Sequence, residues 1–136
     1  MTRMEDPPPA SSGSFVVSAV DLELAPDELD PATVLEGAPE VSDRTVWASA
    51  DGRVERGVWQ ITPGVVTDVE VDEVFVVLSG RATIEIAGGP TLQVGPGDLC
   101  VLEAGARTVW HVHETLRKVF VVALPTEASP EPGASD

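Results

Sequence analysis

Apolar and polar side chains alternate with a period of two through residues 81–86, and no stretch of the chain shows the period of a helix. This alternation is typical of a β-strand with one buried face. Residues 99–102 and 119–124 are apolar at successive positions, as strands buried on both faces are. Short strands separated by turn residues at roughly eight to twelve positions predict an all-β sandwich or barrel.

Gly, Pro and Asp residues mark the turns between the other predicted strands. These strands cover residues 45–50, 53–61 and 67–78. Tight turns are expected at Asp51-Gly52, Pro63-Gly64 and Ser79-Gly80. The alternation and the turns together indicate antiparallel strands that are neighbours along the chain.

The two ends of the chain differ from its centre in composition. Residues 1–14 and 125–136 are rich in Pro, Ser, Gly and acidic residues, and we expect both to be disordered. Between the first tail and a barrel domain at residues 45–124, residues 15–44 form an extended N-terminal arm. Within this arm we expect a short strand at residues 15–20 and one helical turn that opens at Pro26.

The strand predicted at residues 67–78 has two different faces. A period of two points Glu73 inward, between Val71 and Phe75. The opposite face begins with three acids and ends with three apolar residues, namely Asp68, Glu70, Asp72, Val74, Val76 and Leu78. The acidic part is either a solvated face or a Ca²⁺ site made of oxygen ligands. The apolar part needs a cover, from the N-terminal arm or from a second subunit, and we expect a homodimer.

Net charge and cysteine content limit the partners. The formal net charge is −15, which argues against nucleic acid and anionic membranes as partners, since binding to phosphate needs Lys and Arg. Cys100 is the only cysteine, so the chain forms no internal disulfide, and its apolar neighbours predict an inert buried thiol. The first residues lack the apolar core of a secretion signal, and we expect a cytoplasmic location.

Residues 34–124 resemble the cupins, and specifically the third cupin family, which is named after the cupin domain of (S)-ureidoglycine aminohydrolase. The matching segments are Gly57-Val58-Trp59-Gln60, Thr62-Pro63-Gly64, the run from Asp72 to Arg81, Gly97-Asp98, Ala104-Gly105, Trp110-His111-Val112 and Glu114-Thr115-Leu116-Arg117-Lys118. The resemblance implies a small jelly-roll β-barrel. It also implies aminohydrolase-like chemistry on a small nitrogenous metabolite.

The resemblance implies where a metal would bind, and this sequence departs from that pattern. The first cupin motif ends with Glu, six residues and Gly, which Glu73 and Gly80 match. Its two histidine positions fall on Thr67 and Val69 or, in the other register, on Val66 and Asp68. In the second motif Gly97 and Gly105 are kept, Glu103 replaces the proline and Thr108 replaces the histidine. Transition metals bind mainly to imidazole or thiolate, so we expect no tightly held transition metal and no cofactor.

His111 and His113 are an alternative pair of metal ligands. If Thr108 points inward, however, a period of two points Trp110 and Val112 inward as well and both histidines outward. Outward histidines are therefore the expectation.

Glu73 is the main candidate for function. An inward carboxylate without a metal needs a partner, and burial raises its pKa, so Glu73 is a candidate general acid or base or a ligand anchor. The alternative is a structural carboxylate that backbone N–H groups or an inward Arg56 satisfies. The other predicted ligand-binding residues are Trp110, Thr67, Thr108 and Trp59. Arg107 and Arg117 are either surface residues or groups that steer an anionic ligand.

Three functions follow from these observations. The favoured one is a cupin-domain protein that binds a small organic molecule in its barrel without a transition metal. The second is a metal-dependent aminohydrolase-like enzyme, and the third is a structural or interaction module without catalysis.

Overall fold

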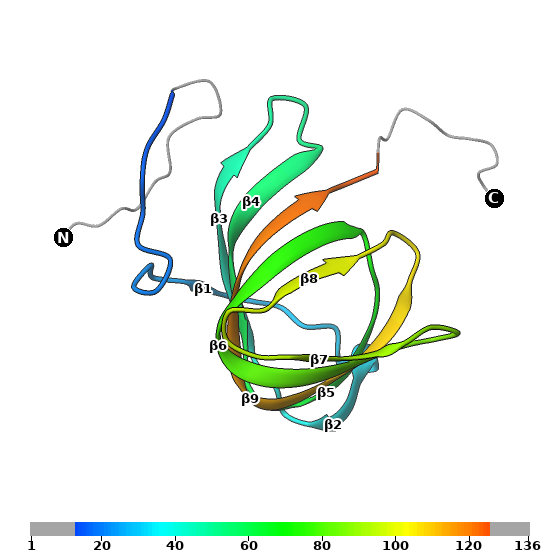
Figure 1. Ribbon diagram of the computed structural model, residues 1–136. Coiled ribbons are helices and arrows are strands. Elements are labelled where there is room, and N and C mark those ends of the chain that lie inside the picture. Colours follow the sequence, from blue (N-terminus) through cyan, green and yellow to red (C-terminus); the bar gives the residue numbers. More distant parts are fainter. Residues whose placement is uncertain (1–12, 126–136) are drawn as a thin grey trace.

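The computed structural model describes residues 13–125, which are organised almost entirely as β-strands (Figure 1). The elements are β1 (Ala25–Asp27), the 3₁₀ helix η1 (Pro31–Thr33), β2 (Val34–Gly37), β3 (Val41–Ala48), β4 (Val54–Ile61), β5 (Gly64–Val69), β6 (Asp72–Ile86), β7 (Thr91–Val94), β8 (Leu99–Leu102) and β9 (Arg107–Ala123). The all-β prediction is confirmed. The disordered tails predicted at residues 1–14 and 125–136 lie almost wholly outside the described residues.

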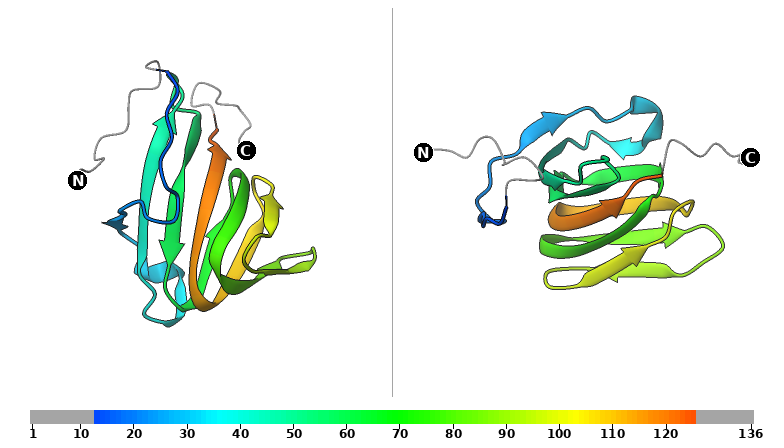
Figure 2. Two further views of the ribbon diagram at one scale, coloured as in Figure 1. Left: turned by 60° about the vertical axis from the view of Figure 1, so that its left-hand side comes forward. Right: turned by 90° about the horizontal axis from the view of Figure 1, so that it is seen from above.

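Two long strands, β6 and β9, hold the sheet together. Antiparallel β9 pairs with β4, β5 and β6, and β6 pairs in addition with β7 and β8. Because both strands bend along their length, the sheet curls around a single interior (Figures 1 and 2). This curled antiparallel sheet is consistent with a cupin jelly roll.

The tight turn predicted at Ser79-Gly80 is wrong. Both residues lie inside β6, where the pairing with β9 shifts its register between Val77 and Ala82. Such irregularities bend a strand without ending it. Gly80 has φ +90°, a conformation that glycine adopts easily. Glycine is favoured for this reason both in tight turns and at bends within a strand, so its presence alone does not distinguish the two.

The N-terminal arm differs from its prediction in two places. Residues 15–20 form no strand, and Pro26 lies in β1 and opens no helical turn. The single helical turn occurs later, at η1, where the Asp30 side chain accepts a hydrogen bond from the Ala32 N–H. Arg117 fixes the start of the arm by donating hydrogen bonds to the backbone carbonyls of Ala19 and Leu22. Arg117 therefore holds the first part of the arm, and pairing of β1 with β3 and of β2 with β5 holds the rest.

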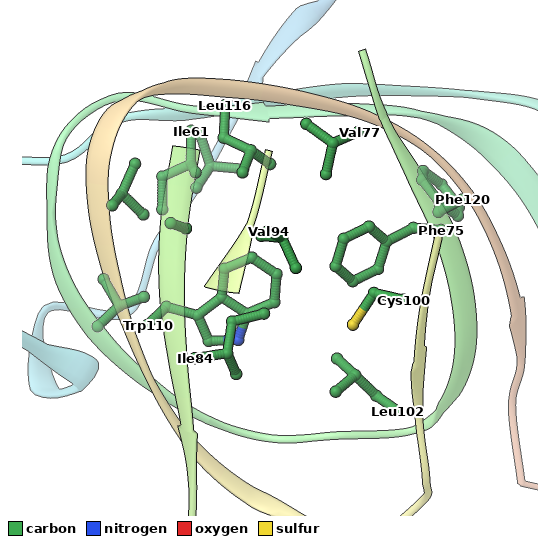
Figure 3. Packing of buried hydrophobic residues seen from close by; sticks show 14 residues of the cluster. Ile61, Phe75, Val77, Ile84, Val94, Cys100, Leu102, Trp110, Leu116 and Phe120 are labelled. Carbon is green, nitrogen blue, oxygen red and sulfur yellow. The ribbon is translucent and has the colours of Figure 1, made fainter. Parts of the chain in front are cut away.

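The core fills the inside of the curl (Figure 3). Its largest fully buried side chains are Phe75, Ile61, Ile84, Leu116 and Val77. Cys100 belongs to the same cluster, and burial raises the pKa of its thiol to about 11. The thiol therefore stays protonated at neutral pH, as the prediction of an inert cysteine requires.

An apolar surface lies on the outer side of β8, β6 and β9. The register places Val76 between Leu99 and Val119, and Val74 between Val101 and Val121. Leu99 and Val101 are 64% and 63% exposed. Val74 and Val76 thus point outward, as predicted, and are part of a wider apolar surface. We call this surface the apolar outer face; it consists of Val74, Val76, Leu99, Val101, Val119 and Val121.

No helix described between residues 13 and 125 has the length and hydropathy that a membrane span needs.

Candidate functional site

A cavity of about 300 Å³ lies between the curled sheet and the N-terminal segment 27–29. Its apolar walls include Trp59, Trp110 and Phe120. The polar residues that line it are Asp27, Glu28, Thr67, Asp68, Glu70, Glu73 and Lys118. Apolar walls with a few converging polar groups are typical of small-molecule sites.

Glu73 forms a buried ion pair in this cavity. Its Oε2 lies 2.8 Å from Lys118 Nζ, and the two side chains are 8% and 6% exposed. Lys118 enters from β9, where it pairs with Trp59 of β4 and Val77 of β6. The inward position predicted for Glu73 is correct. Its partner is Lys118, whereas Arg56 lies with its Cζ 4.1 Å from the centre of the Trp47 ring.

Three aromatic rings surround the ammonium group of Lys118. Its Nζ lies 4.3 Å from the ring centroid of Phe75, 4.4 Å from that of Trp59 and 4.9 Å from that of Trp110. A cation over an aromatic face is attracted by the ring, most strongly where water is excluded. Trp59 and Trp110 also contact each other in an edge-to-face arrangement, with centroids 5.9 Å apart. The three rings and Glu73 together offset the free energy that the Lys118 ammonium group loses when it is removed from water.

Glu70 is the second buried carboxylate of the site. It is 6% exposed, and its Oε2 accepts hydrogen bonds from Thr108 Oγ1 at 2.7 Å and from Trp110 Nε1 at 3.1 Å. Burial raises the pKa of Glu70, and these two hydrogen bonds only partly oppose the effect. The solvated acidic face predicted for Glu70 is wrong, because the chain turns a corner between β5 and β6. There Glu70 donates its N–H to the Ala106 carbonyl and accepts from the Gly105 N–H.

The corner also separates Asp68 from Asp72. In β5, Val66 and Asp68 pair with Trp110 and Thr108, so the inward register at the first cupin motif is Val66 and Asp68. Asp68 lines the cavity at its exposed rim, as the prediction of a solvated acid has it, and partial loss of solvent is the main cause that raises its pKa. Asp72 instead accepts a hydrogen bond from the Ala104 N–H.

The other predicted ligand residues occupy different positions around the cavity. Trp110, Trp59 and Thr67 line it, and the Thr67 hydroxyl lies 3.4 Å from the Thr33 carbonyl, to which it donates. Thr108 is 2% exposed and contacts the cavity through Glu70. Arg117, one of the two arginines considered as groups that steer an anion, donates hydrogen bonds to the N-terminal arm and does not line the cavity.

The two histidines contact outer-surface residues of the neighbouring strand. His111 Nε2 lies 3.3 Å from Glu85 Oε1, and His113 Nε2 lies 2.8 Å from Thr83 Oγ1. Neither residue lines the cavity. The outward histidines agree with the expectation drawn from the period of two.

The residues at the cupin metal position do not fit a transition metal. Val66, Asp68, Glu73 and Thr108 stand at the four ligand positions, and the Glu73 carboxylate already holds an ammonium group at 2.8 Å. Within residues 13–125, no group of three or more His, Cys, Asp or Glu side chains is arranged to hold a metal ion. Lys118 supplies positive charge beside Glu73.

Lys118 and Glu70 are the site residues that sequence reasoning missed. Lys118 is the only lysine of the chain, and it follows Arg117 as if in a surface basic pair. The period of two that points Thr108 and Trp110 inward reaches Lys118 when it is continued, so a signal for Lys118 existed. Glu70 had none, because its position depends on the corner between β5 and β6.

Asp43 and Asp27 form an acidic pair next to the cavity. Burial, followed by a hydrogen bond with Asp27, raises the pKa of Asp43 from 3.8 to about 6. A folded-state pKa above the unfolded value means that the protonated form stabilises the fold. This contribution is complete below the unfolded pKa and is lost as the pH rises through about 6.

We therefore expect the free energy of unfolding to fall between pH 4 and pH 7.5 by more in the wild type than in Asp43→Asn. The asparagine keeps the neutral form at every pH. Urea denaturation across this range measures the difference, with the exposed Glu103→Gln as the control. Equal pH dependence in wild type and Asp43→Asn would contradict this assignment.

The sequence of this chain matches the model of one known protein family. The model of the EutQ-like cupin domain matches residues 48–120. No curated protein matches the chain.

Solved structures share the fold at low identity. A protein of unknown function from Pseudomonas syringae pv. tomato has a TM-score of 0.74 and 23% identity, and the match covers 83% of this chain and 49% of that one. This chain thus spans about half the length of that protein. The Clostridium difficile EutQ protein has a TM-score of 0.56 and 16% identity over 72% of this chain and 81% of its own. The cupin domain of Schizosaccharomyces pombe Cnp3 has a TM-score of 0.59 and 11% identity over 81% and 74%.

Proposed function

We propose that this chain, which belongs to the EutQ-like cupin family, binds a small organic molecule in the cavity of its barrel without a transition metal. The observation that carries the proposal is a 300 Å³ cavity in which aromatic walls meet three buried charged side chains. These are Glu70, Glu73 and Lys118. Burying a charged group costs free energy even when the group is paired, and apolar side chains would fill the same space without that cost. Buried charges beside a cavity therefore favour a functional role.

The residues around the cavity have different roles in binding. Trp59 and Trp110 form the flat wall, and Thr67 adds a hydroxyl. Glu73 and Lys118 form the polar base of the site, and Thr108 holds Glu70 in place.

A library of metabolites of mixed charge, screened by native mass spectrometry, tests the proposal. We expect a compound that binds one to one and that loses affinity by about tenfold or more in Trp59→Ala, because burying an aromatic wall residue against a ligand is worth more than 1 kcal/mol. Trp47→Ala is the matched control, since Trp47 does not line the cavity. If no compound binds, the cavity has no ligand function and a structural or interaction module is the better description.

An aminohydrolase-like enzyme acting on a small nitrogenous metabolite is the second candidate. One observation favours it, namely that Glu73 and Lys118 lie 2.8 Å apart in the cavity and form a pair able to exchange a proton. Ammonia release from ureido compounds by the purified protein, lost in a Glu73→Gln variant that is still folded by circular dichroism, would support this reading. Turnover that persists after treatment of the protein with a chelator would show that the reaction does not depend on a metal ion.

The apolar outer face supports a homodimer, and the single cysteine is consistent with the cytoplasmic location that we also propose. We expect light scattering at micromolar concentration to give a dimer mass, because isologous pairing buries the same apolar face on both subunits. Val101→Glu puts a charge in this face and should give a monomer. Val69→Glu, at another exposed valine, should remain a dimer, and a monomer mass for the wild type would contradict the proposal.

A further inference from the structure

The cavity contains far more negative than positive charge. Five carboxylic acids line it, on Asp27, Glu28, Asp68, Glu70 and Glu73, against the single ammonium of Lys118. We propose that the ligand of this cavity is a small organic cation, a protonated amine or a quaternary ammonium compound. This inference rests on the proposed function, because it specifies the chemical class of the molecule that the cavity binds.

An anionic ligand finds no free positive charge in the cavity. The Lys118 ammonium already holds Glu73 at 2.8 Å. Its remaining surroundings are the rings of Phe75, Trp59 and Trp110, all with centroids within 4.9 Å. Glu73 and Lys118 therefore cancel each other, and a ligand meets the buried Glu70 together with the exposed acids Asp27, Glu28 and Asp68.

Glu70 is a buried carboxylate with one oxygen available. Thr108 and Trp110 both donate to Oε2, and no residue within 13–125 donates a hydrogen bond to Oε1. Since Glu70 lines the cavity and is only 6% exposed, the open side of this carboxylate belongs to the cavity. An ammonium group donates hydrogen bonds and carries the opposite charge, which makes it the suited partner for this oxygen.

The carboxyl groups of Glu70 and Asp68 are only partly compensated within the protein, by hydrogen bonds and, at Asp68, by the charge of Lys118. Burial raises the pKa of Glu70, and partial loss of solvent raises that of the more exposed Asp68, in both cases against the opposing effect of their hydrogen bonds. A bound cation would favour their ionised forms and lower both pKa values. Binding should therefore release protons and strengthen as the pH rises above the ordinary titration range of a carboxyl group.

The walls favour an organic cation over a metal ion. Trp59, Leu29 and Val41 offer apolar contact to a carbon body, and no described group of side chains is arranged to hold a metal ion. A volume of 300 Å³ equals the space of about ten water molecules, which suits a compound of a few carbon atoms. An alkylammonium group can place its charge at Glu70 and its carbons on Trp59.

Three probes of equal length and different charge test the inference. They are n-butylamine, which is protonated at pH 7, n-butanol and butyrate. Binding is followed by amide chemical shifts of the full chain and by tryptophan fluorescence. We expect n-butylamine to shift the signals of cavity residues and to bind at least about tenfold more tightly than either of the other probes. We expect the same tenfold loss of n-butylamine affinity in Glu70→Gln and no change in the exposed Glu114→Gln.

Each other outcome overturns the inference. Butanol or butyrate binding in the cavity as tightly as butylamine would reject a cationic ligand and leave the proposed small-molecule function standing. Failure of butylamine to bind would also reject it, while the library screen decides the proposed function separately. If Glu70→Gln does not fold, Asp68→Asn takes its place, and unchanged butylamine affinity there counts against the inference.

Discussion

Replacing Lys118 with methionine should lower the free energy of unfolding by about 3–5 kcal/mol, because it leaves the Glu73 carboxylate buried without its partner. The ion pair is 2.8 Å long, and both side chains are less than one tenth exposed. The substitution also removes the cation that Trp59, Phe75 and Trp110 surround. Urea denaturation at pH 7, followed by tryptophan fluorescence, measures the loss.

A double substitution separates the ion pair from the packing of the lysine stem. Lys118→Met with Glu73→Gln removes both charges, and we expect it to recover most of the lost stability. Glu73→Gln alone should also destabilise the fold, since it leaves the ammonium of Lys118 without its carboxylate. If the double variant is as unstable as Lys118→Met alone, packing explains the loss and the charge pair does not.

Substituting Gly80 by alanine should lower the free energy of unfolding by about 2–5 kcal/mol. Gly80 has φ +90°, which is strained for any other residue, and an added Cβ would collide with the backbone of Thr115 and Leu116 in β9. The same denaturation experiment measures this effect.

Gly52→Ala is the matched control for Gly80→Ala. Gly52 has φ +75° in an exposed hairpin turn, and nothing lies within 4 Å of an added Cβ. Its substitution should therefore cost only the conformational strain, about 1 kcal/mol. Equal losses in the two variants would show that the contact between β6 and β9 at this bend contributes nothing.

The strands were predictable because their signals are local. A period of two and the turn residues around Gly52 and Gly64 depend on neighbours in sequence, and the structure has strands on both sides of each turn. Ser79-Gly80 shows the limit of this reasoning. A glycine with positive φ serves a bend within a strand as well as a turn between strands, and only the pairing with β9 distinguishes the two.

The site was only partly predictable, for a similar reason. Glu73 and Trp110 lie within continuous strands, so counting by two places them correctly. Glu70 lies where the chain turns from β5 into β6, and contacts with Gly105 and Ala106, distant in sequence, set its direction. A period of two holds only within a strand. The prediction treated residues 67–78 as one strand, and it therefore placed Glu70 on the solvated face.

The central place of β9 has a consequence for synthesis. Strands β4, β5 and β6 all hydrogen-bond to β9, which is the last of the described strands to be made. Until β9 has left the ribosome, these three strands lack the partner that joins them, and the nascent chain exposes unpaired strand edges. The sheet therefore closes only after β9 has been translated.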